Sequence, residues 1–544
     1  MSKVKDLLRQ HYLIAIALLI LSLIRFTSAV PVLFVADSMK FISPEDLIRM
    51  RDFDSIWSIL NFSIFERVLN YYIQIWNNND LSWSITINKI SSILSTLLVY
   101  LIVFRSTKAY YLSLITAIIF SLNPALLYIE QVVMAEANFI FFVLLITSLL
   151  QVILLESKTT NLVKASILSL IAGLIAGLAA LTKQTADNWI IFVFIVLMLI
   201  GIYQFLKSKK RYFIIVASVF FLSSFIVKVP VYWGNYNSFG TFDPMLSRTV
   251  DSGRGGFLWS LTEEMVYANP STSYPWLTQA IIQTTENFKS NFAIDDKSSV
   301  TSPFYMAISA INVAGREGRL INPETGMAIS MEEWPTICSK YWFDLCFYQP
   351  LKLAKRIFQK SLVNMFLKED LGLFVFENSL RPQVNFQPIQ YTKVPFSFKD
   401  QFDPRLFGLR AERLSVSTSE ITKVHDFYSY FKLVSSPNDY WIMINMDTPY
   451  AFRAPLASVS LWWQKIWAWL PWIYFIAPLF LVSLTIYLWK RKFTLFDLFI
   501  LGSCAYYIGL PLLFSHAEPR YRLQFIHFML IFIAISFPRR HNKD

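Results

Sequence analysis

Four short stretches place ionisable residues at the ends of long apolar runs, where burying a charge is expensive. The stretches contain Asp37; Glu130 and Glu136; Lys183 and Asp187; and His516, Glu518, Arg520 and Arg522. A carboxylate in such a position can act as a general base. Lysine and arginine can hold a phosphate, arginine through a bidentate fork. The four stretches together predict a site that acts on an anionic, lipid-embedded substrate.

Each candidate also has an ordinary structural explanation. Asp37 could be a solvated loop residue, whereas Glu136 lies about one turn inside an apolar run, where solvation is harder. Lys183 and Arg522 could extend to lipid headgroups, as long cationic side chains commonly do. Arg25 and Lys228 could do the same or form interhelical pairs. Asp52 and Asp54 formally match an Asp-x-Asp metal pattern, but the wet face of an amphipathic helix is the favoured interpretation.

The composition defines the setting of these residues. Of 544 residues, 55% are hydrophobic, 17% are aromatic and only 16% are charged, against about 25% charged in soluble domains. An ordinary soluble enzyme, a disordered chain and a small disulfide scaffold are thereby excluded. The net charge of +12 would suggest nucleic acid in a soluble protein. In a membrane protein it indicates Lys- and Arg-rich cytoplasmic loops instead, so no nucleic-acid partner is expected.

The apolar runs predict an all-α polytopic bundle of about ten transmembrane helices. The expected spans are 11–33, 90–104 (extending back to about 85), 109–128, 132–155, 162–181, 188–206, 212–233, 466–488, 495–514 and 521–537. Lys and Arg concentrate in alternate short loops and in both tails, which predicts that both termini are cytoplasmic. All four stretches of candidate residues then face the opposite, outer side. The N-terminal run is too long for a cleaved signal peptide and contains Arg25.

Three modules follow from this topology. Residues 1–233 form an N-terminal transmembrane module with an outer loop at 34–84, residues 234–465 form a mixed extracytoplasmic segment, and residues 466–544 form a C-terminal transmembrane module. The patterns at 45–60 and at 64–76, whose apolar face includes Tyr72 and Trp76, predict amphipathic helices that either lie in the outer interface or pack on the bundle. A basic amphipathic stretch at 351–366, with Lys352, Lys355, Arg356 and Lys360 on its polar side, could rest on anionic headgroups. Cys338 and Cys346 could form a disulfide, and Cys504 lies within a span.

These motifs resemble those of the GT-C glycosyltransferases that use polyprenyl-phosphate sugars, the group of protein O-mannosyltransferases and bacterial aminoarabinose transferases. Asp37 resembles the acidic motif of the first outer loop, and Asn123-Pro124 through Glu136 resembles the entry to the fourth span. The Gly-rich stretch that ends at Lys183 and the sequence Glu518-Pro-Arg-Tyr-Arg522 resemble two further motifs. Mannosyltransferases carry Asp-Glu in the first loop, whereas Ser38 follows Asp37 here, which argues against protein mannosylation.

The resemblance implies an inverting transfer of a sugar from a polyprenyl-phosphate donor to a lipid, glycan or protein acceptor on the extracytoplasmic face of a membrane, most simply a bacterial inner or plasma membrane. Asp37 would be the general base, with Glu136 as its catalytic partner. Lys183, Arg520 and Arg522 would bind the donor phosphate. Glu130, Asp187, His516 and Glu518 would support the acceptor or the site. No cofactor is required, although a divalent metal is possible. The alternatives are a transporter or flippase of a lipid-linked or anionic substrate, a polysaccharide polymerase or ligase, and a non-catalytic membrane scaffold.

Overall fold

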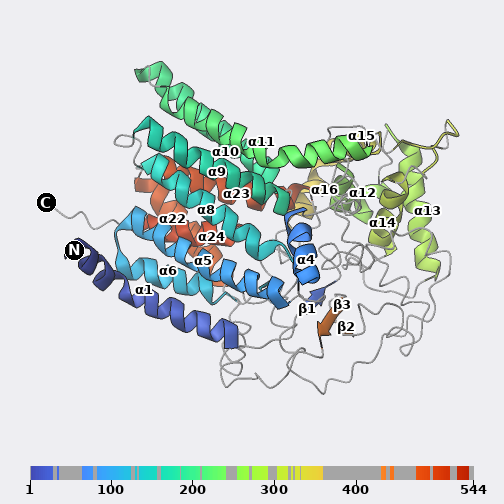
Figure 1. The fold of residues 1–544 in the computed structure, drawn as a ribbon. Helices are drawn as coiled ribbons and strands as arrows, with labels where there is room; N and C mark the ends of the chain where they lie inside the picture. Colours follow the sequence, from blue (N-terminus) through green and yellow to red (C-terminus); the bar gives the residue numbers. More distant parts are fainter. Residues whose placement is uncertain are drawn as a thin grey trace.

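The computed structural model describes most of the hydrophobic chain and parts of the polar segment. The described residues are 2–27, 33–35, 64–76, 82–239 and 254–358 (both with short gaps), 431–435, 441–445, 473–490, 494–514 and 524–537. Helices dominate these ranges, and they form one bundle with a second group of helices beside one end of it (Figure 1). The predicted all-α polytopic membrane fold is confirmed. Below, the segment end of the bundle means the end that lies beside residues 254–355.

The N-terminal part of the bundle consists of long apolar helices. They are α1 (Ser2–Thr27), α5 (Ser82–Thr107), α6 (Tyr110–Ser121), α8 (Glu136–Leu155), α9 (Leu162–Thr182), α10 (Thr185–Ser208) and α11 (Tyr212–Phe239). Among the described residues, five helices are long and apolar enough to cross a membrane, namely α5, α8, α9, α10 and α11. Five shorter apolar helices coincide with the remaining predicted spans. The total of ten spans therefore stays a prediction.

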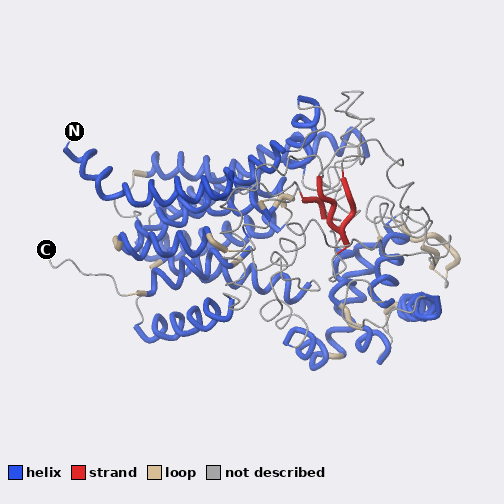
Figure 2. The backbone as a smooth tube through the Cα atoms, turned by 90° about the horizontal axis from the view of Figure 1, so that it is seen from below, coloured by secondary structure: helices blue, strands red, loops and turns tan. Residues whose placement is uncertain are grey.

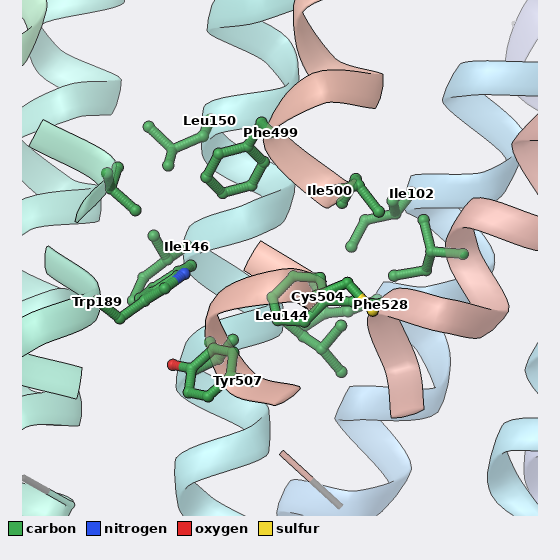
Figure 3. Packing of buried hydrophobic residues seen from close by; sticks show 14 of the residues in the cluster. Ile102, Leu144, Ile146, Leu150, Trp189, Phe499, Ile500, Cys504, Tyr507 and Phe528 are labelled. Atoms are coloured by element: carbon green, nitrogen blue, oxygen red, sulfur yellow. The ribbon is translucent and has the colours of Figure 1, made fainter. Parts of the chain in front are cut away.

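The C-terminal helices complete the bundle instead of forming a separate body. They are α22 (Ile473–Lys490), α23 (Leu495–Phe514) and α24 (Ile526–Ser536). Figure 3 shows Trp189 of α10 beside Tyr507 and Phe499 of α23 and Phe528 of α24. The Trp189 indole nitrogen also donates a hydrogen bond of 3.2 Å to Ser503 Oγ. Residues more than 300 positions apart thus share one core.

The outer surface of the bundle is apolar along its middle and aromatic toward its ends. Leu199 of α10, Leu222 of α11 and Leu481 of α22 are all exposed. Exposed aromatic residues stand near the helix ends, with Trp83 and Trp233 at the segment end and Trp489 at the other. Exposed leucines along several helices would be unfavourable in water, and tryptophan concentrates at membrane–water boundaries. This distribution is that of a protein embedded in a bilayer.

Two glycines allow α9 and α11 to pack closely. A Cβ atom on Gly173 would lie 1.9 Å from Ser223 Oγ and 2.3 Å from the Phe220 carbonyl oxygen. A Cβ atom on Gly177 would lie 2.6 Å from the Ser224 carbonyl oxygen. Small residues at such crossings let helix backbones approach each other in membranes. The contact fixes the end of α9, and therefore the position of Lys183.

Helix α4 (Ile64–Trp76) packs on the segment end of the bundle. Its buried Ile64 and Tyr71 share a small apolar cluster with Leu181 of α9 and Val231 of α11. Of the two predicted positions for this helix, the packed one is confirmed. Tyr72 and Trp76, which the sequence pattern assigned to the apolar face, are exposed. Glu66 and Asn70 are buried in their place, so the helix is rotated relative to the expectation. The helix predicted at 45–60 lies outside the described residues.

A short antiparallel sheet joins two distant parts of the chain. The strands are β1 (Leu33–Val35), β2 (Phe431–Ser435) and β3 (Trp441–Asn445), in the order β1-β3-β2. Leu33 pairs with Ile444 and Val35 with Ile442. Figure 2 shows the sheet between the bundle and the helices of the polar segment. The first span was predicted to run to residue 33, but α1 ends at Thr27 and Leu33 is in the sheet. The sheet connects the loop after α1 to the chain just before the C-terminal helices.

Residues 254–355 form a compact helical unit with its own core. Its elements are η2 (Arg254–Ser260), α12 (Glu263–Ala268), α13 (Pro275–Asn291), α14 (Pro303–Arg316), α15 (Trp334–Tyr348) and α16 (Pro350–Lys355). Trp334 and Tyr341 of α15 are buried, and their polar atoms are satisfied by Asn312 at 2.9 Å and Thr278 at 2.9 Å. Cys338 and Cys346 are both buried and are not joined to each other, so the suggested disulfide is absent. This unit is the folded core of the predicted extracytoplasmic segment.

Candidate functional site

Three helix ends bring the candidate residues of the N-terminal module together. Helix α8 begins at Glu136, α9 ends at Thr182 and is followed by Lys183, and α10 begins at Thr185 with Asp187 in its first turn. All three ends lie at the segment end of the bundle (Figure 1). The turn between α9 and α10 is tight, because the Ala186 amide donates to the Lys183 carbonyl oxygen at 2.9 Å. Lys183 and Asp187 are therefore held at fixed positions relative to α8.

The centre of the site is an ion pair between Glu136 and Lys183. Lys183 Nζ lies 2.9 Å from Glu136 Oε1, and the exposed fractions of the two side chains are 18% and 7%. Lys183 is therefore not simply extended toward headgroups. Its Nζ also lies 5.8 Å from the centre of the Phe139 ring, within cation–π range. Glu136 Oε2 is buried without a hydrogen-bond partner in the structure. An ammonium group can donate three hydrogen bonds. The pair therefore offers a substrate one unused acceptor, Glu136 Oε2, next to the remaining N–H donors of Lys183.

A second carboxylate, Glu66 of α4, lies in the same buried region. Asn138 of α8 donates from Nδ2 to Glu66 Oε1 at 3.1 Å and to Asn88 Oδ1 of α5 at 3.3 Å. Ser91 of α5 donates to Asn138 Oδ1 at 2.6 Å. Glu66 Oε2, like Glu136 Oε2, is buried with no hydrogen-bond partner. The polar network therefore ties α4 and α5 to the first turn of α8, two residues from Glu136.

Burial raises the pKa of the Glu66 carboxyl well above its usual value. The hydrogen bond from Asn138 acts in the opposite direction and lowers this pKa, and the nearby charge of Glu136 raises it further. Glu66 is on α4, outside the membrane-spanning helices. Since desolvation favours the neutral form of an acid, Glu66 holds its proton at pH values where an exposed glutamate is ionised. Glu136 differs from Glu66 in having a lysine ammonium as its partner, with Lys183 Nζ 2.9 Å from its Oε1.

A separate ion pair fixes α10 to α11. Lys228 Nζ lies 2.9 Å from Asp187 Oδ1, and Lys228 also lies 4.4 Å from the Phe225 ring centre. Of the two roles considered for Lys228, the interhelical pair is the one observed. Tyr506 of α23 donates to the carbonyl oxygen of Thr185, two residues before Asp187, at 3.0 Å. Asp187 thus takes part in a contact that positions the start of α10, close in sequence to Lys183.

The remaining predicted site residues have different outcomes. Glu130 is buried in the turn that precedes α8, where its amide donates to the Leu126 carbonyl oxygen at 3.2 Å. The other predicted residues lie outside the described residues, so their approach to Glu136 and Lys183 stays a prediction: Asp37, His516, Glu518, Arg520 and Arg522. Within the described ranges, no group of three or more His, Cys, Asp or Glu side chains could hold a metal ion. The metal requirement stays open for the rest of the chain.

Glu66, Asn88 and Asn138 are the site residues that the sequence analysis missed. One signal for Glu66 was available, namely a single acid inside the amphipathic pattern of 64–76. That signal alone does not separate a buried acid from a solvated one. Asn88 and Asn138 lie one in each of two apolar spans, where an amide needs a partner. Their pairing was not evident, because Asn88 and Asn138 are 50 residues apart in the chain.

The fold and the site define a polytopic helical membrane protein with ionised and amide side chains gathered at one end of its bundle. Residues 70–242 match the sequence profile of the family described as dolichyl-phosphate-mannose-protein mannosyltransferase. This is a GT-C glycosyltransferase family, so the resemblance inferred from the motifs is confirmed, with the match lying in this part of the chain. The matched residues make up about a third of the 544-residue chain, and they include both Glu136 and Lys183. Searches of curated proteins and of solved structures gave no significant match.

Proposed function

We propose that this protein transfers a sugar from a polyprenyl-phosphate donor to an acceptor hydroxyl or amine on the extracytoplasmic face of the membrane. The observation that carries the proposal is the Glu136–Lys183 pair at the start of α8, within the matched residues 70–242. Its unpartnered carboxylate oxygen suits a hydrogen-bonded acceptor group, and its ammonium suits a phosphate oxygen. The asymmetry of Lys and Arg between alternate loops supports the extracytoplasmic side.

The proposed chemistry is a single displacement at the anomeric carbon. The acceptor oxygen or nitrogen attacks that carbon, and the bond from the carbon to the phosphate oxygen breaks. Asp37 removes the proton of the acceptor, and the polyprenyl phosphate leaves with the electron pair, so the configuration at the sugar carbon inverts. Lys183, with Arg520 and Arg522, stabilises the charge that shifts to the departing oxygen. Glu136 holds Lys183 and orients the acceptor.

We infer that the two buried acids of the site have different roles. Glu136 is paired with the Lys183 ammonium, whereas burial raises the pKa of the Glu66 carboxyl and so favours its neutral form. An ionised carboxylate can accept a hydrogen bond from an acceptor hydroxyl, and a neutral acid can donate one. Glu66 reaches the catalytic region through Asn138. We assign Glu66 as a positioning residue for the first turn of α8.

The test is an assay of purified protein in liposomes with a panel of polyprenyl-phosphate sugars labelled in the sugar. Lys183→Met and Glu136→Gln are expected to lower the transfer rate by about 10²-fold or more, as for loss of one electrostatic contact to a transition state. Lys207→Met, at the opposite end of α10, serves as the control and should keep the normal rate. Normal transfer by both site variants would overturn the assignment of the site.

The same preparation separates the transferase from a flippase. A transferase converts the labelled donor into free polyprenyl phosphate and a glycosylated acceptor, whereas a flippase moves the donor between leaflets without breaking its glycosidic phosphate bond. Thin-layer analysis of the lipids measures the first outcome, and accessibility of the donor to an external reagent measures the second. Movement without cleavage for every donor in the panel would overturn the proposed reaction.

A further inference from the structure

An exposed apolar ridge runs along the end of the 254–355 unit. We define it as Phe343, Phe347, Tyr348, Leu351 and Phe358. Leu351, Phe347 and Phe358 have exposed fractions of 84%, 78% and 68%. Phe343 and Phe347 stack one turn apart on the face of α15 opposite its buried core. A contiguous group of large apolar side chains on the surface usually marks a contact with a membrane or a partner.

The ridge is fixed at the level where a membrane helix ends. Arg356, between Leu351 and Phe358 in the chain, is buried and donates from Nη1 to the carbonyl oxygens of Leu512 at 3.2 Å and Leu513 at 3.3 Å. These carbonyls belong to the last turn of α23, where no intrahelical donor remains for them. The sequence pattern placed Arg356 on a polar, headgroup-facing side, and that placement is wrong. The guanidinium instead caps the apolar helix.

The contact with α23 places the part of the ridge around Arg356 beside the end of an apolar helix. The apolar helix α23 ends at Phe514, so its last turn marks the edge of the hydrocarbon region. Leu351 and Phe358 are close to Arg356 in the chain, so they lie near that edge. Helix η2 also packs against α23, and Gln349 donates to the Met265 carbonyl oxygen at 3.0 Å, so the ridge is attached rigidly to the unit. Figure 1 shows α16 beside the bundle and α13 far from it.

The charges around the ridge favour anionic headgroups. Lys340 is exposed on the same face of α15 as Phe343, and Lys352 and Lys355 follow Leu351 in α16. Lys355 has one acidic neighbour, Glu264, at a long distance of 3.4 Å. Aromatic residues in a row with lysines are typical of surfaces that insert into the boundary between headgroups and acyl chains. A bilayer offers both the apolar depth and the negative charge.

We propose that this ridge inserts into the leaflet at the segment end of the bundle and holds the 254–355 unit against a surface containing anionic lipids. The unit is then tied to the membrane at two levels, through Arg356 to the end of α23 and through the ridge to the lipid itself. The proposal does not depend on the transferase reaction, and it predicts the same contact for an inactive variant such as Glu136→Gln.

The experiment uses the full chain in nanodiscs of phosphatidylcholine and phosphatidylglycerol. Leu351→Cys is labelled with an environment-sensitive fluorophore, and emission is measured with and without acyl chains that carry a spin-label quencher. Met327→Cys is the matched control, since Met327 is also an exposed apolar residue but lies in the loop between α14 and α15. The native cysteines Cys338, Cys346 and Cys504 are all buried, and the unsubstituted protein measures their background labelling.

The expected result is a blue-shifted emission at 351 that loses most of its intensity in quencher lipid, with little loss at 327. Phe358→Cys provides the same measurement if the first variant does not fold. A blue shift that quencher lipid leaves unchanged would mean that another part of this chain, or a protein partner, covers the ridge, and it would overturn the proposal. An unshifted, unquenched emission at both 351 and 358 would overturn it too.

Discussion

The protonation of Glu66 gives a prediction that can be worked out quantitatively. Replacing Glu66 by glutamine keeps an oxygen at the position that accepts from Asn138 Nδ2 and keeps a neutral side chain. The substitution removes only the ability to ionise. If the buried carboxyl is neutral in the folded protein, Glu66→Gln should fold normally, and its free energy of unfolding should depend less on pH than that of the unsubstituted protein.

The sign and size follow from the raised pKa. The carboxyl has its ordinary pKa of 4.5 in the unfolded chain and a pKa well above this in the folded protein. Between these two values the folded state holds a proton that the unfolded state has lost. Raising the pH through this window therefore lowers the stability of the unsubstituted protein, by about 1.4 kcal/mol for each pH unit. Below the window the contribution is fully present, and above it the loss is complete.

The assay is thermal or denaturant unfolding in detergent at pH 5 and pH 6, for the unsubstituted protein and for Glu66→Gln. Other groups titrate in both proteins, so the difference between them isolates Glu66. On going from pH 5 to pH 6, the variant should gain stability relative to the unsubstituted protein, by up to about 1.4 kcal/mol. Glu264→Gln, at an exposed glutamate of the 254–355 unit, should show no such gain. Parallel pH dependences for Glu66→Gln and the unsubstituted protein would refute the assignment of a neutral Glu66.

Three further predictions test the bundle and the site. Gly173→Ala should lower the free energy of unfolding by about 1–3 kcal/mol, because the added Cβ would meet the backbone of α11. Gly509→Ala, whose Cβ would have no atom within 4 Å, should be neutral or slightly stabilising. Equal unfolding temperatures for the two variants would contradict the close packing of α9 and α11. In a double-mutant cycle, the effects of Asp187→Asn and Lys228→Met on the free energy of unfolding should be non-additive, with a coupling energy of about 0.5–3 kcal/mol. Additive effects would rule out this ion pair as a stabilising contact. Asp37→Asn should reduce sugar transfer by about 10²-fold or more while leaving the unfolding temperature unchanged, and a normal transfer rate would exclude Asp37 as the base.

Much of the bundle followed from the sequence because a bilayer imposes a simple rule. A helix that crosses a membrane needs a long apolar run, and the runs at 162–181, 212–233 and 495–514 correspond closely to α9, α11 and α23. Charge at the helix ends also marked Glu136, Lys183 and Asp187 as unusual. The ends of α1 and α6 were less predictable, because a run of apolar letters does not distinguish helix from strand or turn. Leu33 to Val35 illustrates this, since the last residues of an apolar run form β1.

The arrangement of partners was decided by the tertiary structure. The sequence indicated that Glu136 and Lys183 are exceptional, but their contact depends on α8 and α9 meeting at one end of the bundle, 47 residues apart in the chain. Arg356 could not be assigned from an amphipathic pattern, because its partners are carbonyl groups at the end of α23, more than 150 residues away.

The sequence by itself therefore determined that the protein is a membrane bundle, where its apolar helices run and which charged residues need an explanation, because hydrophobic burial and the cost of burying charge are local properties of the chain. Only the tertiary structure decided which charges are paired and which acid is neutral. Glu66 shows why. Its pKa depends on desolvation when α4 packs on the bundle, on the hydrogen bond from Asn138 and on the charge of Glu136. Asn138, Glu136 and the helices that bury Glu66 are all distant from it in the sequence.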